Sequence, residues 1–255
     1  EDMSDRRIAI VTGAGQGIGR ETSVVLAREG FTVVCVDING AAAQETATMV
    51  NGIAAPAMDV RDEAAVAALV AGLERCDVLV SNAGIWKFTS LLETPVSEAN
   101  DVLSVNVVAP LIWIKAVAPL MAKNGGGSIV HLTSVAARAV ASGTGIYPAS
   151  KAGVIALTEQ AALELGPMGI RVNAVGPGRI ETEGTAGRTG GNEDSLIGAS
   201  AIALGRWGRA NDIAEAIGFL CSPQSSYITG QVIWVDGGLT IGTNDYLRHM
   251  RTSKK

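Results

Sequence analysis

The chain has 255 residues, a mass of 26.1 kDa and a formal net charge of −5. Its 20 basic and 25 acidic side chains are scattered rather than clustered, which argues against nucleic acid or an anionic membrane as a partner. Three dispersed cysteines argue against a disulfide framework and indicate a reducing, cytoplasmic location, and two separate histidines offer no metal-ligand cluster. The longest apolar run, at 107–121, contains Pro110, Lys115 and Pro119 and is too short and interrupted to span a bilayer.

Apolar runs and helical periodicity alternate along the chain. In chain order they predict a strand at 8–11, a helix at 18–29, a strand at 31–36, a helix at 41–50, a strand at 53–58, a helix at 62–73, a strand at 77–80, a helix at 96–121, a strand at 128–133, a helix at 147–165, a strand at 170–175, a helix at 212–220 and a strand at 232–235. Nearly continuous apolar strands are typical of a parallel sheet that is buried on both faces. We therefore predict an α/β fold of one domain, in which a doubly wound parallel sheet carries helices on both faces.

Two segments depart from this alternation. Residues 178–205 are rich in Gly, Thr, Ser and Glu and have weak periodicity, which is typical of a lid or a binding loop. The tail at 239–255 ends in a basic, polar stretch and is expected to be mobile. The folded domain is therefore expected to span 7–238, with a substrate lid at about 178–205.

A glycine-rich turn separates the first strand from the first helix. Its glycines, Gly13, Gly17 and Gly19, let the backbone approach a pyrophosphate, which can then bind the unpaired N–H groups at the start of the helix. A tight connection without any ligand would also use glycines. The position of this turn, directly after a strand and before a helix, favours nucleotide binding.

An acidic residue, Asp37, ends the second predicted strand. A carboxylate there can accept hydrogen bonds from both hydroxyls of an adenine ribose and would repel a 2′-phosphate. An aspartate in an ordinary turn would occupy the same place. The cation Arg20 directly follows the glycine-rich turn in the sequence. We predict NAD as the cofactor, with NADP as the less favoured one.

A phenol and an amine lie four residues apart at the start of a predicted helix. Tyr147 and Lys151 therefore point the same way, and a cation beside a phenol is expected to lower the pKa of that phenol. Tyr147 could then exchange a proton near neutral pH, as general acid–base catalysis requires. An exposed helix face would show the same spacing, but Ser134 follows the neighbouring strand, where ligands of such sheets bind.

Several motifs together resemble those of the short-chain dehydrogenase/reductase family, in its common NAD(P)-dependent branch. They are TGAGQGIG at 12–19, NAG at 82–84, Asn106, Ser134, YPASK at 147–151 and PG at 177–178, in the family's order. The resemblance covers about 7–238. It implies a seven-stranded Rossmann-like domain, commonly tetrameric, that oxidises alcohols or reduces carbonyls.

The resemblance also implies roles for individual residues. Tyr147 would be the catalytic acid/base, and Lys151 would hold the nicotinamide ribose and lower the pKa of Tyr147. Ser134 would bind the substrate oxygen, and Asn106 would anchor a water that links Lys151 to solvent. Cofactor contacts would come from Tyr147 and Lys151 and from Gly13, Gln16, Gly17, Ile18, Gly19, Asp37, Ile38, Asp59, Val60, Asn82, Ala83, Gly84, Pro177, Gly178, Ile180 and Thr182.

These observations predict an NAD-dependent oxidoreductase that acts on a secondary alcohol or ketone, working as a homotetramer on a small-molecule substrate. An NADPH-dependent reductase of the 3-oxoacyl-carrier-protein type shares the motif set, although Asp37 argues against it. A non-catalytic nucleotide-sensing protein would be expected to lack Tyr147 or Lys151, and a SAM-dependent methyltransferase would not require them together. The sequence does not identify the substrate.

Overall fold

The computed structural model describes residues 7–183, 199 and 201–241. Its centre is a seven-stranded sheet in the order β3-β2-β1-β4-β5-β6-β9, in which each neighbouring pair is parallel. The strands are β1 (Ile8–Thr12), β2 (Thr32–Val36), β3 (Ile53–Ala54), β4 (Val78–Ser81), β5 (Gly127–Leu132), β6 (Ile170–Pro177) and β9 (Val232–Val235). The predicted seven-stranded, doubly wound parallel sheet is confirmed.

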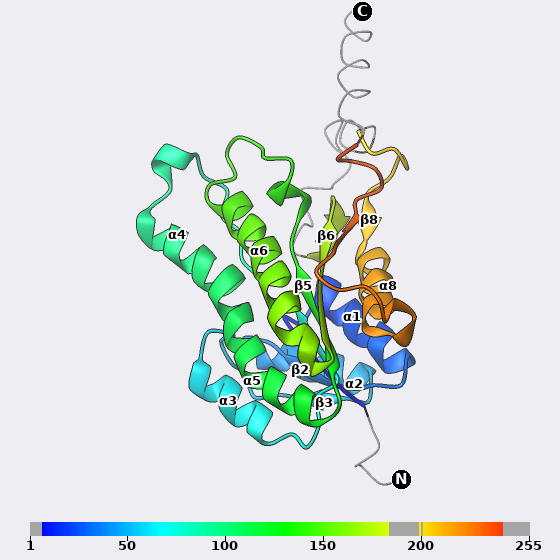
Figure 1. Cartoon of the computed structure of the whole chain (residues 1–255). Helices are drawn as coiled ribbons and strands as arrows, with labels where there is room; N and C mark the ends of the chain where they lie inside the picture. The colour runs from blue at the N-terminus through cyan, green and yellow to red at the C-terminus, as the bar shows by residue number, and fades with distance from the viewer. Residues whose placement is uncertain (1–6, 184–198, 200, 242–255) are drawn as a thin grey trace, which may run out of the picture.

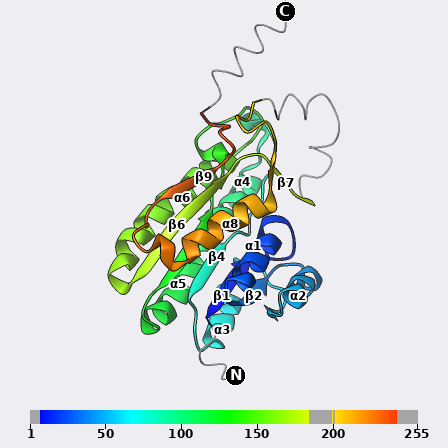
Figure 2. The same cartoon turned by 90° about the vertical axis from the view of Figure 1, so that its right-hand side faces the viewer.

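Helices cover both faces of this sheet (Figures 1 and 2). One face carries α1 (Gly17–Arg28), α2 (Gly40–Met49) and α8 (Ala210–Cys221), and the other carries α3 (Glu63–Ala71), α4 (Val96–Leu103), α5 (Ala109–Lys123) and α6 (Tyr147–Leu165). Successive strand residues face opposite sides: Ile10 packs in one hydrophobic cluster and Val11 in the other. The strands are apolar at nearly every position because both of their faces are buried.

Shorter elements connect these layers. A two-stranded sheet pairs β7 (Ile180–Glu181) with β8 (Gly208–Arg209) at the two ends of the segment predicted as a lid. Residues 184–198 and 200 of that segment lie outside the described residues, as does the tail beyond 241. The 3₁₀ turns are η2 (Leu91–Glu93), η4 (Val135–Ala137), η5 (Gly166–Met168) and η7 (Pro223–Ser225).

Two predicted elements need correction. The third strand, expected at 53–58, contains only Ile53–Ala54, since it lies at the sheet edge and pairs with β2 alone. The helix expected at 96–121 is interrupted by a π-helical turn, η3 (Ser104–Val108). There the N–H of Ala109 donates to the carbonyl of Ser104, five residues back, and the next residue, Pro110, has no N–H to donate.

One helical stretch within the described part of the chain, Val96–Lys123, is long and apolar enough to cross a membrane. Of its most apolar window, 56% is buried inside the molecule, as in the core helix of a folded domain. This stretch packs against α3 and the sheet through residues such as Trp113 and Val117.

Candidate active site

Many of the predicted site residues lie at or just after the carboxyl ends of β1, β2, β4, β5 and β6, which are at the same end of this parallel sheet. The chain places β2 on one side of β1 and β4 on the other, so the strand order reverses between β1 and β4. Ligands of parallel sheets bind outside the strand ends at such a switch point. The fold therefore brings the motifs together where a cofactor is expected.

The glycine-rich turn is held by the side chain of Asn82. Its Nδ2 donates to the carbonyls of Thr12 at 2.9 Å and Gly13 at 3.1 Å. Gly13 has a φ of +64°, and a Cβ built on Gly19 would lie 2.0 Å from the Gly13 oxygen. Both positions therefore require glycine, and the backbone stays open to close approach by a ligand.

An anionic side chain lies at the start of α1. The N–H of Gly17 donates to Oε2 of Glu183 at 3.0 Å. The N-cap residue Gln16 makes no side-chain cap, and the first turn contains no acidic residue. Helix N-termini favour negative charge, so a bound carboxylate marks this turn as an anion site that fits the predicted pyrophosphate. No sequence motif indicated Glu183, because its partner Gly17 is 166 positions away.

Asp37 is fixed at the end of β2 by two backbone amides. Its Oδ2 accepts from Gly15 N at 2.9 Å and its Oδ1 from Asn39 N at 2.9 Å. Arg20, the cation next to the glycine-rich turn in sequence, donates to the Gly15 carbonyl at 2.6 Å and forms an ion pair with Glu45 at 3.2 Å. The charge of Arg20 is therefore already compensated by a carboxylate.

Asp59, at the predicted adenine edge, forms an ion pair with Arg61 at 2.7 Å. The hydrogen bond from Arg61 lowers the pKa of Asp59, and the same guanidinium reaches Asp101 at 3.2 Å. The carboxylate of Asp59 is thus occupied within the protein. Its neighbour Val60 is buried in the core, whereas Ile38 is exposed and presents apolar surface.

Ser134, Tyr147 and Lys151 lie together as predicted. Ser134 is the N-cap of η4, and its hydroxyl lies near the phenol of Tyr147, the first residue of α6. One turn further along α6, the Nζ atom of Lys151 lies 5.7 Å from the centre of the Tyr147 ring. This Nζ donates to the carbonyl of Leu132, the last residue of β5, at 2.8 Å.

The proton affinities of these groups differ from the sequence-based expectation. Burial raises the pKa of Tyr147 and the hydrogen bond from Ser134 opposes that rise, so the expected lowering by Lys151 is wrong for this structure. Lys151 is only 5% exposed, and burial lowers its pKa to about 8. Burial, together with the charge of Lys151, lowers the pKa of His131 to about 4. Removal from water favours the neutral form of each group.

The side chain of Asn106, in the π-helical turn η3, uses both of its N–H groups and its oxygen in hydrogen bonds. Its Nδ2 donates to the Ile85 carbonyl at 2.9 Å and to Ser150 Oγ at 3.0 Å, and its Oδ1 accepts from Ile85 N at 2.9 Å. A Cβ built on Gly84 would lie 3.2 Å from this Oδ1 and 3.5 Å from Lys151 Nζ. Glycine at position 84 therefore lets Asn106 and Lys151 approach each other.

The backbone carbonyl of Asn106 lacks its usual α-helical donor. Its usual helical donor, four residues later, would be Pro110, which has no N–H. The predicted role of Asn106 as a water anchor therefore requires its main chain rather than its amide.

Two hydroxyls that the sequence analysis missed fix the start of α6. Ser150 Oγ donates to the Tyr147 carbonyl at 2.7 Å while it accepts from Asn106. Thr133 Oγ1 donates to the Lys151 carbonyl at 2.7 Å. Both side chains are buried. The only signal for them in the sequence is that each directly precedes a predicted catalytic residue.

The segment after β6 is held against the end of β9. Gly178 N donates to the carbonyl of Val235 at 3.0 Å, and a Cβ on Gly178 would lie 2.7 Å from the Cα of Asp236. The side chain of Thr182 lies 3.3 Å from a Cβ built on Gly17, so this segment reaches the glycine-rich turn. Within the described ranges, no group of three or more His, Cys, Asp and Glu side chains is placed to hold a metal ion.

Comparisons with known proteins agree with this geometry. A family model described as enoyl-(acyl carrier protein) reductase matches residues 13–240. The 3-oxoacyl-[acyl-carrier-protein] reductase FabG of Thermotoga maritima is 37% identical over 243 residues, which cover 92% of this chain and 98% of that protein. A structure from Sinorhizobium meliloti, described provisionally as a short-chain alcohol dehydrogenase, is 32% identical with a TM-score of 0.86 and covers 94% of this chain and 98% of its own.

A further solved structure, from Beutenbergia cavernae, is described provisionally as an NAD(P) dependent gluconate 5-dehydrogenase and contains NADP at low occupancy. It is 32% identical, has a TM-score of 0.86 and covers 94% of this chain and 98% of its own. With the motif set, the fold and these similarities in agreement, the chain belongs to the short-chain dehydrogenase/reductase family of nicotinamide-dependent oxidoreductases.

Proposed function

We propose that this chain is an NAD-dependent enzyme that transfers a hydride between the nicotinamide and a secondary alcohol or ketone. The observation that carries this proposal is the convergence of the Ser134 hydroxyl and the Tyr147 phenol, one helical turn before the buried amine of Lys151. Two adjacent hydroxyls can bind one substrate oxygen and stabilise the negative charge that develops there.

The chain's own residues handle the proton. In reduction, Tyr147 gives its phenolic proton to the substrate oxygen, and in oxidation it accepts that proton, while Ser134 holds the oxygen in place. The glycine-rich turn would hold the pyrophosphate and Asp37 the adenine ribose; the nicotinamide supplies or accepts the hydride when the cofactor is bound. The hydrogen bonds from Asn106 to Ser150 and from Ser150 to the Tyr147 carbonyl keep the first turn of α6 in position.

The orientation of Asp37 supports NAD as the cofactor. Two backbone amides aim its carboxylate, and Glu45 already compensates Arg20, the cation that would otherwise suit a 2′-phosphate. The similarity to FabG and to a structure with bound NADP favours the alternative, an NADPH-dependent reductase of 3-oxoacyl thioesters on a carrier protein. Asp37 is the residue that distinguishes the two.

Replacement of Asp37 tests the cofactor. We expect the unchanged protein to bind NADH more tightly than NADPH, and Asp37→Ser to shift the ratio of the two dissociation constants toward NADPH by about tenfold or more, or roughly 1.4 kcal/mol. Glu45→Gln, which frees Arg20, should strengthen NADPH binding and leave NADH binding unchanged. Calorimetry with both nucleotides measures this, and tighter binding of NADPH by the unchanged protein would support the carrier-protein alternative.

Removal of one hydroxyl tests the catalytic role of Tyr147. We expect Tyr147→Phe to leave the dissociation constant for NADH nearly unchanged and to reduce turnover by about 10²–10⁴-fold, the usual contribution of a general acid or base. A panel of secondary alcohols and ketones, followed by NADH absorbance, provides the assay. The matched control is Tyr227→Phe, because Tyr227 is fully exposed. Equal turnover in the two variants would remove Tyr147 from the mechanism.

Ser150 offers a test of positioning. Ser150→Ala removes the hydroxyl that links Asn106 to the Tyr147 carbonyl, and loss of one buried hydrogen bond of about 1 kcal/mol predicts a fall in kcat of several-fold to tenfold. The pH profile of kcat should shift as well, while NADH binding stays constant. Ser225→Ala is the control, because Ser225 is equally buried and its hydroxyl bonds the Leu220 carbonyl at 3.0 Å, on a different element. If both variants lose thermal stability but keep the same pH profile, Ser150 has only a structural role.

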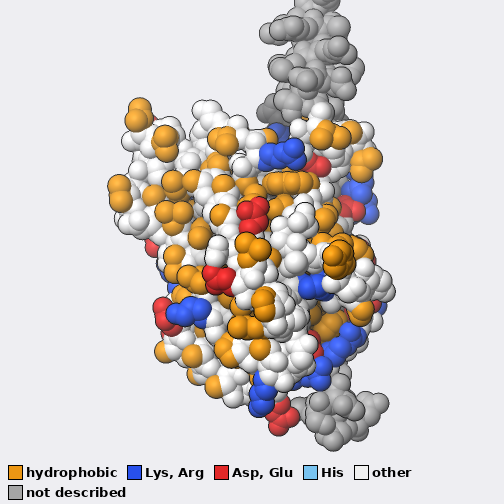
Figure 3. All heavy atoms as spheres, in the orientation of Figure 1, with side chains coloured by type: hydrophobic (Ala, Val, Ile, Leu, Met, Phe, Trp, Pro, Cys, Tyr) orange, Lys and Arg blue, Asp and Glu red, His pale blue; other side chains and the backbone are white. Residues whose placement is uncertain are grey.

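The surface of α4 supports association between copies of the chain. Figure 3 shows hydrophobic side chains on the side of the molecule where α4 lies, and Val96 of α4 is exposed, as are Leu91 and Leu92 of the preceding turn η2. Apolar patches of this kind mark contact surfaces. We therefore expect a homotetramer built through α4, α5 and α6, and light scattering that shows a stable monomer would contradict this expectation.

A further inference from the structure

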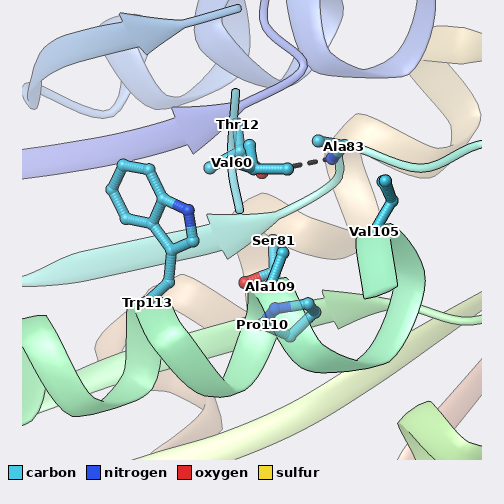
Figure 4. Close-up of a pocket in the computed structure, with 8 residues that line it drawn as sticks. All are labelled: Thr12, Val60, Ser81, Ala83, Val105, Ala109, Pro110 and Trp113. Carbon is cyan, nitrogen blue, oxygen red and sulfur yellow. Dashed lines mark hydrogen bonds between the residues drawn. The ribbon is translucent and has the colours of Figure 1, made fainter. Parts of the chain in front are cut away.

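A cavity of about 10 Å³ lies between the end of β4 and the first turns of α5. Figure 4 shows that its walls include Ser81 from β4, Val105 from η3, and Pro110 and Trp113 from α5. A space of this size holds the centre of one water molecule and nothing larger. None of the lining side chains is charged, so the cavity has no group that would bind an ion.

Two polar side-chain atoms at this cavity have no hydrogen-bond partner among the described residues. They are Ser81 Oγ and Trp113 Nε1, in side chains of residues that are only 7% and 1% exposed. In Figure 4 the nitrogen edge of the Trp113 indole faces the other lining residues. Buried polar atoms in folded proteins are almost always paired with protein or with ordered water.

A backbone carbonyl at the same place also lacks its helical donor. Val105 would normally accept from Ala109, but the N–H of Ala109 donates to Ser104 instead. The next candidate is Pro110, which has no N–H. Because helical carbonyls point toward the C-terminus of the helix, that of Val105 points toward Ala109 and Pro110, and these two residues line the cavity.

Thr12, which also lines the cavity, cannot supply the missing bonds. Its hydroxyl donates to the Val80 carbonyl at 3.3 Å and accepts from Asn82 N and Ala83 N, both at 3.1 Å. One donor and two acceptor sites are all that a hydroxyl has. The unpaired groups therefore need a partner that is not part of the chain.

We propose that this cavity is a binding site for one structural water molecule. The water accepts a hydrogen bond from Trp113 Nε1 and donates one to the Val105 carbonyl. It forms a third hydrogen bond with Ser81 Oγ, in which either oxygen can be the donor. Three bonds are typical of a buried water. It connects the end of β4 to the π-helical turn, and since Val105 precedes Asn106, the water stabilises the turn that presents Asn106 to the active site.

A crystal structure of the unchanged protein at about 1.5 Å resolution tests this site directly. We expect one density peak at about 2.7–3.2 Å from both Ser81 Oγ and Trp113 Nε1. The peak should disappear in the Ser81→Ala and Trp113→Phe variants. A direct hydrogen bond between Ser81 and Trp113, without a peak, would overturn the proposal.

Thermal unfolding provides an independent measurement. If one water links the two side chains, the Tm loss in the Ser81→Ala/Trp113→Phe double variant is smaller than the sum of the two single losses. The control is Ser128→Ala combined with Trp113→Phe, because the buried Ser128 bonds the Leu220 carbonyl directly at 2.9 Å, and these losses should add. Additive losses for the Ser81 pair would contradict a shared water.

Discussion

The amine of Lys151 is buried at the carboxyl end of β5, and much of the site is arranged around that constraint. Burial removes the hydration of an ammonium group, which lowers the pKa of Lys151 to about 8. Its Nζ atom donates to the Leu132 carbonyl, whose direction is set by the sheet. The most rigid part of the fold therefore fixes the position of this amine. A negative charge that binds beside Lys151 would favour its protonated form, so the charge of the site responds to its ligand.

The burial of Lys151 also explains why many polar groups near it form hydrogen bonds with one another. Thr133 bonds the carbonyl of Lys151, and Ser150 bonds that of Tyr147. The side-chain amide of Asn106 forms hydrogen bonds with Ile85 and Ser150. An unpaired polar group in such a buried place would be costly, whereas a complete network is rigid. The side chains of Tyr147 and Lys151 are thus supported by neighbours whose side chains are already hydrogen-bonded within the protein.

Local patterns in the sequence predicted the parts of this protein that local physics determines. Continuous apolar strands indicated a sheet buried on both faces, and the spacing of Tyr147 and Lys151 placed both on one side of α6. The π-helical turn at Asn106 was missed because it depends on the donor that Pro110 lacks. Glu183 could not be predicted as a partner of Gly17, because folding alone brings these distant residues together. The predicted lowering of the Tyr147 pKa by Lys151 was wrong because burial, which a sequence does not show, raises that pKa.

The carboxylate of Glu183 gives the first helix of this protein a built-in counter-anion. A dinucleotide that binds the glycine-rich turn would then replace one negative group by another rather than fill a free site. The free energy of such binding would include the release of that carboxylate. Because Glu183 follows Thr182 and lies two residues after β7, its hydrogen bond to Gly17 connects the residues after β7 with the start of α1.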